Sequence, residues 1–427
     1  MERQDSKLLI LGLLFHPSTT NYGWDMGGAE KRFLQLCKYL AKWSDMVHVM
    51  EPAPSLCYRG TMKYRSFEIN LDSRISKLFG RNLALINWFI KGLPKAISLC
   101  KENNYDVILA HDVRIFDLLM GAITSRLFKI PLVAIAHHLH WIDMSNPVRH
   151  NYNFLRVLKM EMKWGASFFE ALLRCTAAFL ESKLLDYVDY YISVSDSTAK
   201  YLVMNGVSSN KIMVSGNGVD IEFIHSVENN SNERYDAIYV GRLYGGKGIF
   251  DLIKAWKLVV SRDKDARLVV IGGTDANEQK PHELVNELGL SNNIVFKGYV
   301  SDKEVVEYLK SAKVFVLPSK MEGWGMSVAE AVTCGLPVIL YSIQSLYENF
   351  SDYSGAFFVP TGDIEALAKT ILHVLNLSEE KFQEIRNHAL EICNTFDLPN
   401  LFAKEHELLH QVVNKATLKE STIMLQR

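Results

Sequence analysis

Cysteines are few in this sequence of 427 residues, and no two of them form a CxxC pair. The six are scattered along the chain: Cys37, Cys57, Cys100, Cys175, Cys334 and Cys393. A disulfide framework belongs to oxidising compartments, and a zinc site needs closely spaced ligands. We therefore expect buried, reduced thiols in a cytoplasmic protein, and no metal site.

Long apolar runs and an excess of one charge are also missing. No stretch approaches the roughly 18 uninterrupted apolar residues of a membrane-spanning helix. Leu8–Phe15 is apolar but short, and no small-residue cleavage site follows it. We interpret it as a buried first strand rather than a signal peptide. The formal net charge is −1, so no global electrostatic field predicts nucleic acid as a partner.

Basic charge is nevertheless concentrated in two places. Residues 59–101 contain nine Lys and Arg against two acids, and residues 145–185 contain six against three. Bulky apolar side chains are interleaved with these charges, a mixture that suits contact with a membrane surface. Two helices, each with a core face and a solvated face, would have the same composition. The sequence therefore leaves open a peripheral contact with the cytoplasmic membrane face.

Short apolar runs alternate with amphipathic stretches along almost the whole chain. Runs such as Asp236–Gly241 and Val314–Leu317 are nearly continuous rather than alternating, which favours parallel strands buried on both faces. Together with the length, this pattern predicts an α/β fold with two Rossmann-like, doubly wound domains. In such sheets ligands bind at the carboxyl ends of the strands, so we expect the site in a cleft between the domains.

The polar segment Ser226–Glu233 interrupts the pattern, and we place the domain linker there. The predicted division is an N-terminal acceptor-binding domain (1–225), a C-terminal nucleotide-binding domain (226–395), and a C-terminal helix and tail (396–427). The last helix lies beyond the final element expected of the second domain. Packing against the N-terminal domain is one arrangement open to it.

The strongest motif follows the strand Val314–Leu317. Glu322 lies in a glycine-rich loop, and Glu330 lies eight positions later, within a helix that begins near Gly325, Met326 and Ser327. Free backbone amides and the helix dipole at such a start suit a phosphate group. One carboxylate before the helix and one inside it can reach hydroxyl groups on either side of that phosphate.

This segment resembles the E-x7-E signature of retaining GT-B glycosyltransferases of the GT4 family, and the resemblance extends over nearly the whole chain. It implies that Glu322 contacts the donor sugar and that Glu330 contacts the ribose. It places the nucleobase near Val300, at the end of another strand. The donor is then a nucleoside-diphosphate sugar bound as a substrate, with no separate cofactor and no metal.

The second motif, at the strand-to-helix junction opening the second domain, contains Arg242 and Lys247. Two cations can bracket a diphosphate and neutralise the charge that grows as a glycosidic bond breaks. The segment is similar to the family's G-R-x4-K-G pattern, which assigns both residues to the pyrophosphate. It is also close to a P-loop, but Gly248 stands where the magnesium-binding Ser or Thr belongs.

Two weaker signals come from the N-terminal domain. Gly27 and Gly28 follow the first strand and open a helix, where glycines let amides approach a phosphate. In the family pattern these glycines face the donor diphosphate. A histidine follows the strand that ends near Ala136, and alignment with the family favours His137, with His138 next. His111, after another strand, is a cleft candidate or a hydrogen-bonded structural residue.

The combined prediction is a retaining glycosyltransferase that moves a sugar from a nucleoside-diphosphate donor to a glycan or lipid-linked acceptor hydroxyl. His137, Glu322, Arg242 and Lys247 are its predicted catalytic residues. A sugar-nucleotide epimerase and a non-catalytic binding module on the same fold remain alternatives. One departure from the family concerns residues 342–348: the usual glycines are absent, although Glu348 can correspond to the family's glutamate.

Overall fold

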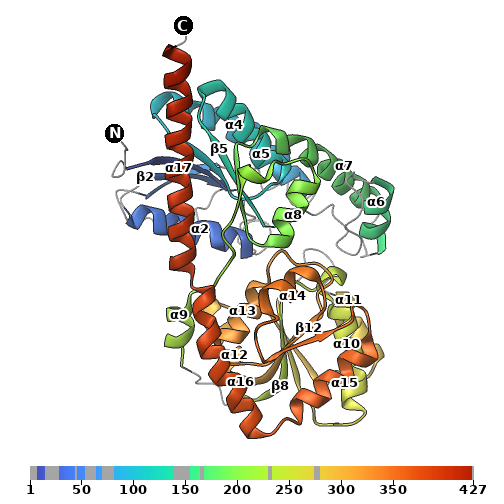
Figure 1. The fold of residues 1–427 in the computed structure, drawn as a ribbon. Coiled ribbons are helices and arrows are strands. Elements are labelled where there is room, and N and C mark those ends of the chain that lie inside the picture. The colour runs from blue at the N-terminus through green and yellow to red at the C-terminus, as the bar shows by residue number, and fades with distance from the viewer. Residues whose placement is uncertain are drawn as a thin grey trace.

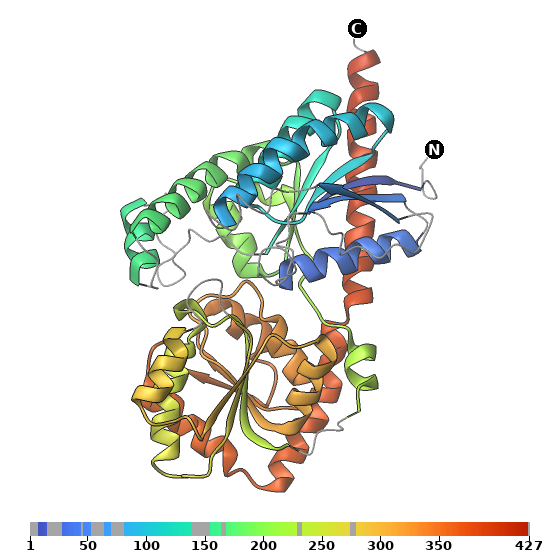
Figure 2. The same ribbon diagram turned by 180° about the vertical axis from the view of Figure 1, so that it is seen from behind.

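The computed structural model describes residues 7–14, 28–43, 46–52, 64–69, 81–137, 154–163, 168–228, 233–273 and 279–425. These residues form two α/β domains, one above the other in Figure 1, each with helices on both faces of a parallel sheet. Figure 2 shows the same two domains from behind. The predicted fold class is confirmed.

The N-terminal sheet has seven parallel strands in the order β3-β2-β1-β4-β5-β6-β7. They are β1 (Leu9–Leu13), β2 (Met46–Pro52), β3 (Tyr64–Ile69), β4 (Val107–Ala110), β5 (Leu132–Ala136), β6 (Tyr190–Ser193) and β7 (Ile212–Val214). The helices around it are α2 (Gly28–Lys42), α4 (Arg81–Glu102), α5 (Ile115–Phe128), α6 (Phe154–Lys163), α7 (Phe168–Leu184) and α8 (Asp196–Met204). Helix α9 (Ile221–Ser226) lies against the C-terminal domain instead, where Lys310 donates to the Ile224 carbonyl over 2.7 Å (Figure 1). Strands β4 and β5 are fully buried, because helices cover both faces of the sheet.

The C-terminal sheet has six parallel strands in the order β10-β9-β8-β11-β12-β13. They are β8 (Tyr235–Val240), β9 (Leu268–Ile271), β10 (Ile294–Gly298), β11 (Ala312–Leu317), β12 (Val338–Tyr341) and β13 (Ala356–Val359). The helices are α10 (Ile249–Val260), α11 (Gln279–Glu287), α12 (Asp302–Ser311), α13 (Met326–Thr333), α14 (Gln344–Phe350), α15 (Ile364–Leu375) and α16 (Glu379–Ile392).

Both sheets reverse their strand order at one place, between β1 and β4 and between β8 and β11. Helices leave opposite faces at such a point, so a crevice opens beyond the carboxyl ends of the two strands. Three of the predicted motifs follow these four strands: the glycine pair follows β1, Arg242 follows β8, and Glu322 follows β11. The topology therefore brings distant parts of the sequence to two neighbouring crevices.

The chain crosses between the domains twice, and the two crossings pair with each other. Val219 and Asp397 form an isolated parallel bridge, and the Val219 amide donates to the Phe396 carbonyl over 2.9 Å. A Cβ built on Gly218 would lie 2.1 Å from that carbonyl oxygen, so a side chain at this position would prevent the pairing. The two chain segments that cross between the domains are thus held together.

Helix α17 (Leu398–Leu425) begins at this junction and runs along the N-terminal domain (Figures 1 and 2). It packs on α2, where the rings of Phe402 and Tyr39 are 5.6 Å apart. The Arg32 guanidinium pairs there with the Glu405 carboxylate, and both side chains are fully buried. The C-terminal segment therefore belongs to the N-terminal domain in space. The predicted boundaries 1–225, 226–395 and 396–427 stay a prediction.

Candidate functional site

The carboxyl ends of the two sheets face each other across the junction between the domains. A Cβ built on Gly28, the first residue of α2, would lie 2.9 Å from the Met326 sulfur at the start of α13. The N-termini of two helices from different domains therefore meet. Each carries free amides and a partial positive charge, so together they form a place where an anion is stabilised. Gly27, the other predicted glycine, lies outside the described residues.

The loop after β8 is packed directly against the end of β11. Gly248 has a φ of +76°, and a Cβ on it would lie 1.8 Å from the Pro318 carbonyl oxygen. No side chain fits there, which excludes the Ser or Thr of a P-loop on steric grounds. The Lys320 amide also donates to the Gly246 carbonyl over 2.9 Å. The loop that carries Arg242 and Lys247 is thus fixed relative to the loop that carries Glu322.

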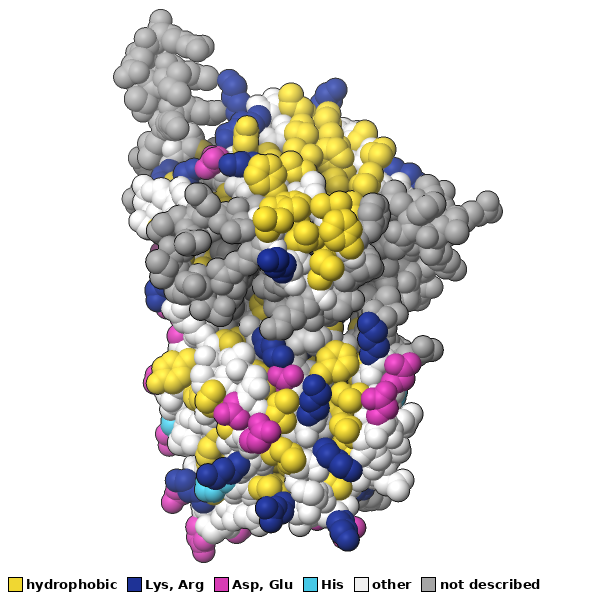
Figure 3. All heavy atoms as spheres, turned by 90° about the vertical axis from the view of Figure 1, so that its right-hand side faces the viewer, with side chains coloured by type: hydrophobic (Ala, Val, Ile, Leu, Met, Phe, Trp, Pro, Cys, Tyr) yellow, Lys and Arg dark blue, Asp and Glu magenta, His cyan; other side chains and the backbone are white. Residues whose placement is uncertain are grey.

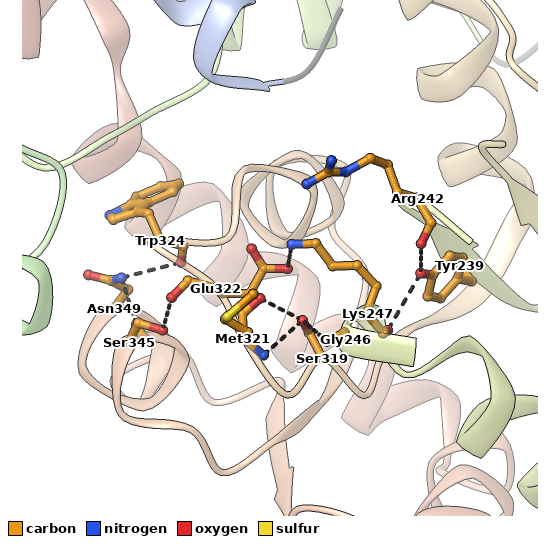
Figure 4. A network of polar contacts seen from close by, with 10 residues as sticks. All are labelled: Tyr239, Arg242, Gly246, Lys247, Ser319, Met321, Glu322, Trp324, Ser345 and Asn349. Carbon is orange, nitrogen blue, oxygen red and sulfur yellow. Dashed lines mark hydrogen bonds and ion pairs between the residues drawn. The ribbon is translucent and has the colours of Figure 1, made fainter. Parts of the chain in front are cut away.

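Lys247 and Glu322 form an ion pair with a Nζ–Oε1 distance of 2.5 Å (Figure 4). Their side chains are only 16% and 12% exposed, so solvent screens the pair weakly. Arg242 extends over the Tyr244 ring, with 5.3 Å from its guanidinium carbon to the ring centroid. In Figure 4 the Arg242 guanidinium and the Lys247 ammonium extend into the same region, next to the Glu322 carboxylate. The structure therefore brings the two predicted cations and the first predicted carboxylate together.

A set of hydrogen bonds holds the backbone on either side of Glu322. The Ser319 hydroxyl donates to the Met321 carbonyl over 3.0 Å, and the Ser345 hydroxyl donates to the Glu322 carbonyl over 2.8 Å. Three residues later Gly325 has a φ of +107° and precedes the first turn of α13. A side chain at Gly325 would contact Leu346 at 2.8 Å. The loop thus enters α13 along a path that only glycine permits.

Glu330 lies in the second turn of α13, half-buried at the domain junction. Burial raises the pKa of its carboxyl group to about 7, and the nearby charge of Lys31 opposes that rise. Lys31, on α2, pairs with Asp302 at the start of α12. Met326 and Ser327 form the first turn of the same helix and are half-buried. Glu330 therefore lies at the same junction as the paired helix N-termini.

His137 follows β5 and is 9% exposed. Burial, and after it the charge of Arg32, keep its pKa well below the ordinary value, so the imidazole is neutral. Its Nε2 atom has no hydrogen-bond partner among the described residues. A neutral ring of this kind can donate or accept one hydrogen bond to a ligand without adding charge. His138 lies outside the described residues.

His111 has a different environment. It is fully buried after β4, with its Nδ1 atom 3.1 Å from the Asp117 carboxylate. Burial works to lower its pKa, and the Asp117 charge and hydrogen bond outweigh burial and raise it. The Trp88 ring nitrogen donates to the other oxygen of Asp117 over 3.1 Å. This pairing supports the structural interpretation of His111 over the ligand-binding one.

Val300 lies between β10 and α12, where Gly298 has a φ of +65° and turns the chain. The Gly298 carbonyl accepts from the Gly272 amide over 2.8 Å, which joins this turn to the end of β9. Val300 is half-buried. The segment 274–278, which follows β9, lies outside the described residues, so the structure describes one side of the predicted nucleobase position.

Two family profiles match adjoining parts of the chain. The profile of glycosyltransferase family 4 matches residues 26–223, and that of glycosyl transferases group 1 matches residues 220–391. A 2-deoxystreptamine N-acetyl-D-glucosaminyltransferase of Niallia circulans is 24% identical over 76% of this chain and 83% of its own. A UDP-Gal:alpha-D-GlcNAc-diphosphoundecaprenol alpha-1,3-galactosyltransferase of Escherichia coli is 26% identical over 78% of this chain and 83% of its own. This chain is a GT4-type glycosyltransferase.

Solved structures agree with the GT-B fold of this glycosyltransferase. Sucrose-phosphate synthase from Thermosynechococcus elongatus superposes with a TM-score of 0.77 at 18% identity, covering 96% of this chain and 100% of that one. Anabaena HepE in complex with UDP-glucose gives 0.69 at 20% identity, covering 95% and 100%. The epimerase and the non-catalytic module are not favoured by these comparisons.

Sequence reasoning missed several residues of the glycosyltransferase site. Lys31 and Asp302 join the domains beside Glu330, and Ser345 and Asn349 bond the loop around Glu322. The one available signal was the departure from the family pattern at residues 342–348. Within the described ranges, no group of three or more His, Cys, Asp or Glu could hold a metal. Nor is any helix there long and apolar enough to cross a bilayer.

Proposed function

We propose that this glycosyltransferase moves a sugar from a nucleoside-diphosphate donor to an acceptor hydroxyl with retention of the anomeric configuration. The observation that carries the proposal is the meeting of the α2 and α13 N-termini at Gly28 and Met326. Glu322 is on the loop that leads into α13, its carboxylate pairs with Lys247, and Arg242 is on the same loop as Lys247. The arrangement suits a dianionic group attached to a hydroxylated sugar.

Each side chain has a role set by its charge. Breaking the anomeric bond places negative charge on the leaving diphosphate and positive charge on the sugar ring. Arg242, Lys247 and the amides of residues 325–327 would stabilise the leaving group, which is where electrostatic catalysis acts most strongly. Glu322 would accept hydrogen bonds from sugar hydroxyls and Glu330 from the ribose.

His137 would bind the sugar as a neutral imidazole, since its lowered pKa leaves it uncharged. Val300 would adjoin the base, and Gly27 and Gly28 the diphosphate. The bond from the anomeric carbon to the diphosphate breaks, a bond to the acceptor oxygen forms on the same face of the sugar, and the proton of the acceptor hydroxyl passes to the released diphosphate. The products are the glycosylated acceptor and a nucleoside diphosphate. The donor takes part as a substrate, and the proposed reaction includes no metal ion and no cofactor.

A thermal-shift screen against UDP, GDP, ADP and their sugar conjugates tests donor binding, because a ligand of the folded state raises the melting temperature. UDP is the first candidate, since the E. coli relative is named for a UDP-sugar and HepE was solved with UDP-glucose. Stabilisation by one nucleotide would support the proposal and identify the base. The absence of a shift with all of them would contradict it.

Substitution of the two cations tests their assignment. Arg242→Ala and Lys247→Ala should each lower kcat about 100- to 1000-fold, the usual loss when one stabilising donor is removed. Lys257→Ala is the matched control, because its ammonium bonds the Leu288 carbonyl on the exposed side of α10. Unchanged transfer and unchanged nucleotide affinity in both cleft variants would refute the diphosphate assignment.

For the acceptor, we propose a glycan or a lipid-linked glycan presented at an anionic membrane. Hydrophobic side chains gather on one face of the N-terminal domain in Figure 3. The α6–α7 patch comprises exposed residues of those two helices: Leu155, Met162, Phe168, Leu173, Phe179 and Leu180. Lys159 and Lys183 are exposed on the same helices, while Glu181 is buried and accepts from the Ile115 amide. Exposed apolar side chains on helices that also carry exposed lysines match an anionic lipid surface.

Vesicle flotation tests this contact. Phe168, which is 59% exposed on the α6–α7 patch, and Leu390, 58% exposed on the C-terminal domain, are matched in exposure. Phe168→Asp should weaken binding to anionic vesicles about tenfold or more, because insertion of one aromatic side chain is worth roughly 1.5–3 kcal/mol. Leu390→Asp should not. Wild-type protein that fails to float with anionic vesicles would exclude the membrane contact and leave the cleft assignment intact.

A further inference from the structure

Helix α14 is bonded to the loop that carries the donor carboxylate. The Ser345 hydroxyl donates to the Glu322 carbonyl over 2.8 Å, and the Asn349 amide donates to the Trp324 carbonyl over 3.3 Å (Figure 4). Asn349 also donates to the Ser345 carbonyl over 2.6 Å, one helical turn back. Two side chains of one short helix therefore hold the backbone from Glu322 to Trp324.

The same helix is bonded to the other domain. The Glu348 carboxylate accepts a hydrogen bond from the Ser197 amide over 2.7 Å. Ser197 is in the first turn of α8, whose N-cap is Ser195. First-turn amides have no partner within their own helix, and the N-terminal partial charge favours a carboxylate. Glu348 is thus a partner from the C-terminal domain for a helix start in the N-terminal domain.

We propose that α14 couples closure of the two domains to the position of Glu322, with Glu348 and Ser345 as positioning residues. Residues 345 and 348 are one turn apart, so a movement of Glu348 toward α8 moves Ser345 with it. Ser345 in turn bonds the Glu322 backbone, and the Glu322 carboxylate pairs with Lys247. This inference rests on the proposed function, because it assigns the coupling to the donor site.

The sequence shows why this chain can make the connection. At residues 342–348 it lacks the glycines of the family pattern. A glycine has no hydroxyl, so the bond from residue 345 to the Glu322 carbonyl depends on the serine that stands here. The functional consequence is exclusion of water. A donor site that is completed only on closure transfers the sugar in preference to hydrolysing the donor.

The test compares four variants: Glu348→Ala, Glu348→Gln, Ser345→Ala and Ser342→Ala. Glutamine keeps an oxygen that can accept from the Ser197 amide, so it should restore most of the function that alanine removes. Ser342→Ala is the matched control, because its hydroxyl donates to the Val359 carbonyl over 3.2 Å within its own sheet. Each variant is measured for UDP affinity, transfer rate and donor hydrolysis.

We expect Glu348→Ala and Ser345→Ala to bind UDP within about twofold of wild type, because the diphosphate groups are untouched. Their ratio of transfer to donor hydrolysis should fall about tenfold, as loss of a hydrogen bond to a charged group predicts for Glu348. A residue that only stabilised the fold would lower both rates together. Small-angle scattering with and without UDP supplies a second readout: Glu348→Ala should lose the compaction that UDP produces in wild type.

A wild-type ratio and wild-type compaction in folded Glu348→Ala would overturn the coupling. So would an equal effect in Ser342→Ala. Failure of the wild-type protein to bind any nucleotide would instead overturn the proposed function, so the two failures are distinguishable.

Discussion

The raised pKa of Glu330 predicts that nucleotide binding releases a proton. Burial raises this carboxyl pKa to about 7 in the unliganded protein, so close to half of the molecules carry a neutral Glu330 at neutral pH. Ribose hydroxyls that donate to the carboxylate favour its ionised form and lower the pKa. The protein must then lose a proton when it binds the donor, and the bound state is favoured as the pH rises.

The magnitude follows from linkage. If binding returns the pKa from about 7 to its ordinary value of 4.5, the Kd for UDP should be about tenfold lower at pH 8 than at pH 6. Calorimetry in two buffers of different ionisation enthalpy would report the proton directly. Glu330→Gln is the control, because the titration of the nucleotide's own phosphate is the same for both proteins.

An equal dependence of the UDP Kd on pH in wild type and Glu330→Gln would refute the predicted proton release.

The raised pKa of Glu330 also predicts how the stability of the unliganded protein depends on pH. A folded-state pKa above the unfolded one adds stability that is full below about pH 4.5 and is lost as the pH rises through about 7. The unfolding free energy of wild type should therefore fall relative to that of Glu330→Gln between pH 5 and pH 8, as measured by urea titration at each pH.

Two further pairs of variants test the packing that supports the cleft. Gly248→Ala should lower the melting temperature sharply and Gly289→Ala only slightly, because both have positive φ but only the first meets an atom, the Pro318 oxygen at 1.8 Å; equal losses would contradict the steric argument. Arg32→Met should destabilise by roughly 3–5 kcal/mol in urea, since it leaves buried Glu405 without its partner. The double variant with Glu405→Leu should recover much of this loss, and failure to recover it would show that the helices themselves no longer pack.

Helices, strands and motifs could be predicted from the sequence because they depend on the order of neighbouring residues. The predicted strand Asp236–Gly241 corresponds to β8, and the predicted strand Val314–Leu317 lies within β11. Continuous apolar runs indicate buried parallel strands whatever their neighbours are. Strands β3, β7 and β13 (Ala356–Val359) were not predicted, since they lie at sheet edges and are short or only partly apolar.

Residue type and spacing also predicted Glu322, Glu330, Arg242 and Lys247 as donor-site residues. A phosphate and a sugar are bound by cations, amides and carboxylates at set spacings. Contacts between segments far apart in the sequence could not be predicted in this way. The pairing of Lys247 with Glu322 spans 75 positions, and the bond from Ser197 to Glu348 spans 151. Sequence spacing carries no information about such distances, since sheet order and the crossing of the chain set them.

The order of residues along the chain therefore specifies which chemical groups the cleft contains: its charges, its helix N-termini and its two sheets. Which of these groups come into contact depends on how the chain is folded. Burial keeps His137 neutral and raises the pKa of Glu330, and Asp117 pairs with His111. Burial and pairing depend on atoms from many segments at once, and that is why a linear pattern cannot specify them.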